Sequence, residues 1–351
     1  MQMFGVDLAA LAVTLAIGAV AGALAWAAAL PLGFLLGSLV VTAGLAIAGA
    51  RPFGKPVTLP ARFRFSFVPV IGVAIGGAFT PQVLAQMPGW APSLLAVAAF
   101  VPLVMASSFT ISRRLGIGRK EALFGAVPGG LIESVTMAEA AGADVRVVMV
   151  MQFLRLILTI LTVPLIFLVL TGHAVGSASG VSLAGGVPLT ARDAALLVLA
   201  GAVGVAGARA LRLPGWIMTG PLLASAAVHG AGWVQGVPPG WMIAATQVVL
   251  GTGLGARFAG IGRDLLLRAG KAALANAAAS LAIAFGFATA LHGLTGEPVA
   301  AVFLAFAPGG LAEMSLIALS LQMSVIYVTA HHVVRIVLAV VVLQGMARRQ
   351  G

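Results

Sequence analysis

Long runs of apolar residues, separated by short polar stretches, make up almost the whole chain. Six runs lie on each side of a small, polar stretch in the middle: 8–30, 32–50, 65–86, 91–111, 122–141 and 147–171 before it, and 193–208, 216–232, 240–257, 272–292, 299–321 and 325–346 after it. Most of them are long enough to cross roughly 30 Å of hydrocarbon as α-helices. The pattern predicts an all-α polytopic membrane protein.

Composition supports this class and excludes others. Of 351 residues, 61% are hydrophobic and 8% are charged, whereas soluble domains average about 25% charged residues. The net charge is +11, but the basic residues lie in short tracts between apolar runs. No polar segment is long enough to fold as a nucleic-acid-binding domain, so direct nucleic-acid binding is not expected. With no cysteine, disulfides and thiolate metal sites are excluded.

One short motif occurs twice, Pro-Gly-Gly-Leu-x-Glu, at 128–133 and at 308–313. An arginine follows each glutamate 22 positions later, inside an apolar run. Other matches keep the same order, including the pair Gly72/Gly76 with the pair Gly251/Gly255. Ordered matches at an offset near 180 indicate an internal duplication. They predict a first membrane repeat at 1–175, a linker at 176–190 and a second membrane repeat at 191–351.

The basic residues predict that the two repeats have inverted topology. The first repeat carries them at 51–64 and 113–120, whereas the equivalent loops of the second repeat, about 231–244 and 293–300, contain no Lys or Arg. Cytoplasmic loops are the basic ones, so equivalent loops lie on opposite faces. Inversion requires an odd number of crossings per repeat. We therefore expect about five transmembrane helices in each, with both termini cytoplasmic in a bacterial inner membrane.

The segments with the repeated motif are the ones that we expect not to cross as regular helices. Each of 122–141 and 299–321 contains helix breakers, and is predicted to be a re-entrant or broken helix; whether it spans stays open. The half-helix after a break offers free N–H groups and a partial positive charge. The candidate substrate- or ion-binding residues in the two motifs are Pro128, Gly129, Gly130, Glu133, Pro308, Gly309, Gly310 and Glu313. Alternatively, each glutamate caps the start of its own helix.

Two arginines and two neighbouring polar residues complete the candidate site. Arg155 and Arg335 lie too deep in apolar runs to reach the membrane surface. They form either structural ion pairs with the motif glutamates or a positive site for an anionic substrate. Gln152 and His332 lie at equivalent positions one turn earlier, as parts of a proton relay or as hydrogen-bonded helix contacts. No residues show metal-ligand spacing, so no metal, cofactor or catalytic residue is expected.

With its duplicated motif, the chain resembles the bacterial AbrB family of integral membrane proteins. The first copy is the more typical one, with Gly142-Ala143-Asp144 and Gln152-Phe153-Leu154-Arg155 after the motif. The second copy differs, with Gln322-Met323-Ser324 and His332 at the corresponding places. The resemblance implies labels such as regulator of gene expression or ammonia monooxygenase, and neither label has a DNA-binding unit or metal-ligand set in this sequence to support it.

We therefore expect a non-enzymatic secondary transporter or exporter of a small polar or charged solute. The alternative is a membrane-embedded regulator that influences gene expression through a partner protein. A membrane monooxygenase is the third reading. The expected partners are the lipid bilayer and an unknown small solute, and a homo-oligomer is left open.

Overall fold

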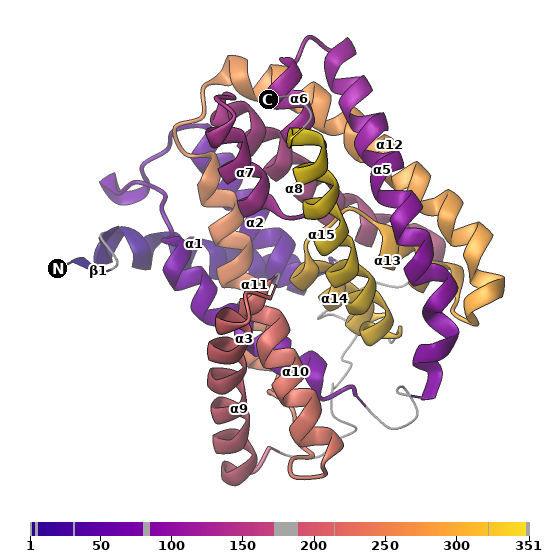
Figure 1. The fold of residues 1–351 in the computed structure, drawn as a ribbon. Coiled ribbons are helices and arrows are strands. Elements are labelled where there is room, and N and C mark those ends of the chain that lie inside the picture. Colours follow the sequence, from indigo (N-terminus) through magenta and orange to yellow (C-terminus); the bar gives the residue numbers. More distant parts are fainter. Residues whose placement is uncertain are drawn as a thin grey trace. The chain divides into compact units, whose positions relative to one another are not determined.

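The structure, a computed structural model, describes residues 2–3, 6–30, 32–79, 85–171, 189–213, 215–321 and 323–348. Its elements are shown in Figure 1. Two strands of two residues, β1 (Gln2–Met3) and β2 (Val6–Asp7), pair near the N-terminus. The other regular elements in the described ranges are helices. The prediction of an all-α fold is confirmed, apart from this short strand pair.

The helices follow the predicted apolar runs closely. Before residue 172 they are α1 (Leu8–Ala27), α2 (Gly33–Ile47), α3 (Ala61–Gly76), α5 (Ala91–Arg114), α6 (Arg119–Gly125), α7 (Leu131–Ala140) and α8 (Val145–Thr171). After residue 188 they are α9 (Ala191–Ala210), α10 (Trp216–Gly230), α11 (Gly240–Gly255), α12 (Arg263–Thr295), α13 (Val299–Phe306), α14 (Leu311–Ser320) and α15 (Val325–Arg348). Short 3-10 helices η1 (Pro52–Gly54), η2 (Met87–Trp90) and η4 (Ala256–Phe258) join some of them.

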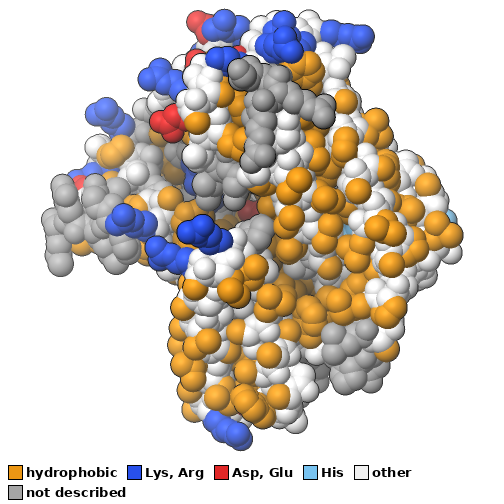
Figure 2. Space-filling view, in the orientation of Figure 1, with side chains coloured by type: hydrophobic (Ala, Val, Ile, Leu, Met, Phe, Trp, Pro, Cys, Tyr) orange, Lys and Arg blue, Asp and Glu red, His pale blue; other side chains and the backbone are white. Residues whose placement is uncertain are grey.

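Six helical segments are long and apolar enough to cross a membrane: Leu8–Ala27, Met87–Arg114, Val145–Val169, Ala191–Ala210, Arg263–Thr295 and Val325–Met346. The chain is therefore a membrane protein. Four further helices, α2, α3, α10 and α11, have only 15 or 16 residues, or about 24 Å at 1.5 Å per residue. The count of ten crossings stays a prediction. Figure 2 shows hydrophobic side chains covering the outer faces of α5 and α12 and, separately, of α9 and α10.

The chain forms two compact units, and each unit takes helices from both halves of the sequence. Unit 1 comprises 1–84, 163–261 and 319–325, and contains α1, α2, α3, α9, α10 and α11. Unit 2 comprises 85–162, 262–318 and 326–351, and contains α5, α6, α7, α12, α13 and α14, with most of α8 and α15. The predicted linker at 176–190 lies almost entirely outside the described residues.

Glycines hold the helices of unit 1 together. A Cβ added at Gly72 or Gly76 of α3 would lie 2.6 Å from the Met218 or Leu222 carbonyl oxygen of α10. A Cβ at Gly251 of α11 would lie 2.3 Å from a carbonyl oxygen of α2. Real Cβ atoms do not approach backbone so closely, so only glycine permits these contacts. The prediction that this matched pair of glycine motifs forms helix contacts is confirmed.

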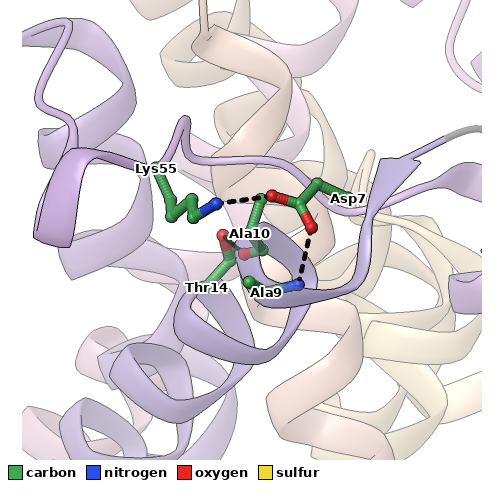
Figure 3. A network of polar contacts seen from close by, with 5 residues as sticks. All are labelled: Asp7, Ala9, Ala10, Thr14 and Lys55. Carbon is green, nitrogen blue, oxygen red and sulfur yellow. Dashed lines mark hydrogen bonds and ion pairs between the residues drawn. The ribbon is translucent and has the colours of Figure 1, made fainter. Parts of the chain in front are cut away.

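Polar contacts fix the start of α1 (Figure 3). The Asp7 carboxylate accepts a hydrogen bond from the Ala9 amide at 3.1 Å and pairs with the Lys55 ammonium at 2.7 Å. Both contacts lower the pKa of Asp7, the lysine hydrogen bond most strongly. The Thr14 hydroxyl, which donates to the Ala10 carbonyl, accepts from the Thr58 amide at 3.2 Å. The segment after η1 is thus fastened to the first turns of α1.

Candidate functional site

Both copies of the repeated motif lie in unit 2, and each interrupts a helix. The first break separates α6, which ends at Gly125, from α7, which begins at Leu131. The second separates α13, which ends at Phe306, from α14, which begins at Leu311. Proline has no N–H to continue a helical ladder, and Pro128 and Pro308 are both buried in these breaks. The prediction of a broken helix at each motif is confirmed.

The glycines of the first break adopt conformations that other residues rarely reach. Gly129 has φ of 120°, and Gly130 has φ of 63° and ψ of 48°, which is left-handed backbone. A side chain at either position would be strained. Gly130 is the residue that directly precedes α7, so the turn that it makes sets the direction in which this half-helix starts.

Gln152 of α8 binds the end of the helix before the first break. Its Nε2 donates to the Phe124 carbonyl at 2.9 Å and to the Val127 carbonyl at 3.3 Å. These carbonyls lose helical partners because α6 stops here. The Gln152 Oε1 accepts a hydrogen bond from Arg155 Nη2 at 2.6 Å. One amide side chain therefore connects the arginine to the break.

His332 of α15 makes the corresponding contacts at the second break. Its Nε2 lies 2.9 Å from the Leu304 carbonyl, and its Nδ1 lies 3.2 Å from Arg335 Nη2. A carbonyl only accepts and a guanidinium only donates. The pattern therefore assigns a neutral imidazole with its proton on Nε2. In this arrangement His332 is a hydrogen-bonded link, the second of the two roles that the sequence left open.

The two sets of contacts match at a separation of 180 residues. Gln152 binds Phe124 where His332 binds Leu304, and Arg155 binds Gln152 where Arg335 binds His332. Helix starts show the same separation, since α7 and α14 begin at Leu131 and Leu311. The duplicated motif is thus accompanied by duplicated contacts, a correspondence that the sequence offset alone could not supply.

The two arginines nevertheless differ in their hydrogen bonds. Arg335, 1% exposed, also donates to the carbonyls of Ala307 and Gly309, the latter at 2.8 Å, and approaches that of Phe306 at 3.5 Å. Arg155, 5% exposed, has its Nε and Nη1 without a hydrogen-bond partner among the described residues. A buried donor left unpaired costs about 1–3 kcal/mol, and more when charged. Arg335 therefore braces its break, whereas Arg155 keeps donors in reserve.

Each break lies against the helix that carries the arginine of the other copy. A Cβ added at Gly129 would be 3.2 Å from Ile336 and 4.0 Å from Arg335 Nε. A Cβ added at Gly310 would be 3.2 Å from Leu156. The positive charges of the two guanidiniums also repel each other. The candidate residues of the two motifs thus meet at one place within unit 2.

The glutamate of the second motif lies at the start of its own helix. Glu313 is the third residue of α14, and its Oε2 lies 2.0 Å from where a Cβ of Gly310 would stand. Glu121 has the same relation to Gly118 at the start of α6. A carboxylate in the first turn stabilises a helix. The Glu313–Arg335 ion pair stays a prediction, and the predicted Glu133–Arg155 pair lies outside the described residues because the Glu133 side chain is not described.

Sequence reasoning missed the backbone carbonyls, because any residue type can supply them. It also missed Ser134 of α7, whose buried hydroxyl has no hydrogen-bond partner in the part of the chain described. His331, adjacent to His332, points to a different contact: its Nε2 lies 2.8 Å from the Ser93 hydroxyl and its Nδ1 lies 2.7 Å from the Tyr327 carbonyl. Among the described residues, no cluster of three or more His, Cys, Asp or Glu could hold a metal ion.

Replacing His332 with glutamine is expected to leave stability almost unchanged, because Gln152 makes the same pair of contacts in the first break. Replacing it with leucine leaves the Leu304 carbonyl and one Arg335 donor unpaired, and is expected to cost about 2–4 kcal/mol. Thermal unfolding of the purified protein in detergent measures both variants. Equal losses for the glutamine and leucine variants would contradict the equivalence of the two networks.

Comparisons with known proteins agree with the sequence resemblance. The profile of the family described as "Transition state regulatory protein AbrB" matches residues 34–350. The chain is 25% identical to "Uncharacterized protein YhjN" of Bacillus subtilis (strain 168) over 357 aligned residues, which cover 95% of this chain and 91% of that protein. It is 28% identical to "Putative regulator AbrB" of Escherichia coli (strain K12) over 293 aligned residues, covering 82% of this chain and 81% of that protein.

Proposed function

Since the chain belongs to the AbrB family and folds into long apolar helices, we propose that it is a secondary transporter or exporter of a small polar or charged solute. One observation carries this proposal: two broken helices and two buried arginines from distant parts of the sequence meet within one compact unit. Backbone that leaves the helix inside a membrane needs cover from protein or a water-filled cavity. Transporters use such interrupted helices to form their substrate sites.

The internal organisation supports a transport mechanism based on symmetry. The separations between matching helices are constant over long stretches: α9 begins 183 residues after α1, and α11 begins 179 residues after α3. Together with the alternating basic loops, this favours two inverted repeats of about five transmembrane helices and one broken helix. In such proteins alternating access arises when one part rocks against another around a fixed site. We place both termini in the cytoplasm and the protein in the bacterial inner membrane.

In this proposal the residues of the two breaks have distinct tasks. Gly129, Gly130 and Gly310 keep the backbone free of side chains where a solute must approach it. Gln152 and His332 hold the carbonyls before each break, so that the half-helices keep their direction. The protein acts without a cofactor and catalyses no reaction.

The proposal is tested by solute release from proteoliposomes. Vesicles with and without the purified protein are loaded with a small-molecule extract of bacterial cells, and mass spectrometry identifies the solutes that leave only the protein-containing vesicles. We expect one solute or a related few. Gly129→Ala, which places a side chain at φ of 120° beside Arg335, should slow this release at least tenfold. Gly260→Ala is the control, because Gly260 also has positive φ but has open space around it.

A regulatory role is the second candidate, favoured by the word "regulator" in the name of the Escherichia coli relative. Such a protein would act through a partner bound to the basic loops at 51–64, 113–120 or 257–271. The vesicle experiment needs no partner, so it separates the two roles. Identical solute release with and without the protein would refute transport and leave regulation.

A further inference from the structure

We propose that the solute is a small oxyanion, such as a carboxylate or phosphate, and that Arg155 binds it directly. This inference rests on the transport function proposed above and names the class of substrate. It starts from the difference between the two arginines. Arg335 uses its donors on the carbonyls of the second break, and Arg155 does not use its Nε and Nη1 on any described residue.

Arg155 has the chemistry and the fixed position that anion binding requires. A guanidinium has five N–H donors, of which Nε and Nη1 supply three. The side chain is almost completely buried, so water does not satisfy these groups from bulk solvent. The Nη2 bond to Gln152, which is itself bound to the first break, holds the guanidinium in place. A ligand therefore meets donors that are already oriented, which lowers the entropy lost on binding.

The first break adds further donors of the same sign. The α7 helix follows Gly130, a residue without a side chain to cap it, and the N-terminal end of a helix carries a partial positive charge. Ser134 in the first turns of α7 has a buried hydroxyl without a partner among the described residues, and a hydroxyl can donate to an anion. Val127, to which Gln152 is bound, lies in the same break.

Electrostatics favour a negative ligand at this place. The two buried guanidiniums repel each other, and a bound anion near Arg155 reduces this repulsion. Arg335 cannot do the same work, because its hydrogen bonds fasten the second break. An oxyanion accepts several N–H bonds at once in the planar geometry of a guanidinium. A spherical halide lacks that directionality, so the site should prefer oxyanions over chloride.

The test measures binding directly, in the purified full-length protein in detergent. Thermal unfolding is followed while sodium acetate, succinate or phosphate is titrated against sodium chloride at equal ionic strength. We expect at least one oxyanion to raise the Tm of the wild-type protein in a saturable manner. Arg155→Gln should weaken this binding by about 10- to 100-fold, as expected for charge-assisted hydrogen bonds. Arg146→Gln is the matched control, since Arg146 lies exposed on the same helix.

The outcomes separate this inference from the transport proposal. An oxyanion effect lost in Arg155→Gln and kept in Arg146→Gln supports the site, and the responding salt distinguishes carboxylate from phosphate. Absence of any oxyanion effect beyond chloride, or an effect that persists in Arg155→Gln, overturns it. Transport is judged independently in the proteoliposomes. Release of a neutral solute that is insensitive to Arg155→Gln would retain the transporter and reject the anion, whereas binding without release would do the reverse.

Discussion

Replacing Arg335 with methionine is expected to destabilise the protein by about 3–5 kcal/mol, the range observed when one partner of a buried charged contact is removed. The guanidinium donates to the carbonyls of Ala307 and Gly309 and to His332. Methionine fills similar space but donates nothing, so these acceptors remain buried without partners. Unfolding in mixed micelles, monitored by tryptophan fluorescence, measures the change.

The same replacement at Arg155 is expected to cost less than about 1.5 kcal/mol. Only the bond to Gln152 is lost, and a charge with several unpaired donors leaves the interior, which offsets part of that loss. The pair of variants thus compares the same side-chain change at equivalent positions of the two breaks. A loss at Arg155 as large as that at Arg335 would show that Arg155 has a strong partner, with the Glu133 carboxylate the first to examine.

The second large effect is expected at Gly251, where α11 crosses α2. A methyl group at this position would meet the Leu35 carbonyl oxygen at 2.3 Å and the Ser38 hydroxyl at 2.1 Å. Backbone cannot yield as a flexible side chain can, so the two helices must separate. Gly251→Ala is expected to cost about 3 kcal/mol, the upper part of the range for overpacked sites, and Gly251→Leu more. Thermal unfolding in detergent measures both.

A control lies on the opposite helix of the same contact. Gly44 of α2 has open space around it, so Gly44→Ala adds a side chain without a clash. Because alanine loses less backbone entropy than glycine on folding, we expect a gain of about 0.5–1 kcal/mol. If both alanine variants behave alike, close packing is not the reason for glycine at position 251.

The helix breaks could be predicted from the sequence because their cause is local. Proline and glycine interrupt a helix wherever they occur together, so Pro128 and Pro308 marked both breaks. Helix ends depended on wider context. The run at 65–86 yields a helix that starts earlier, at Ala61, and ends at Gly76, whereas the run at 272–292 lengthens to Arg263–Thr295. Apolar periodicity does not specify where such a helix starts and stops.

The roles of the two arginines could not be predicted, because they depend on backbone carbonyls. Arg155 and Arg335 occupy equivalent positions after identical motifs, and the sequence gives no reason to treat them differently. The difference comes from how Ala307 and Gly309 present their oxygen atoms to Arg335. Gln152 and His332 lay in between: the offset of 180 singled them out, but their carbonyl partners emerged only from the folded chain.

The two units also have a consequence for how the protein is made. Unit 2 combines helices α5 to α7, synthesised early, with α12 to α15, synthesised last. The ribosome therefore delivers α8 and its buried arginine to the membrane long before the helices that surround them exist. During that interval the insertion machinery or other membrane proteins must shield the charge. Any chain that stops before α15 lacks the final wall of the site, and cellular proteases can recognise it as incomplete.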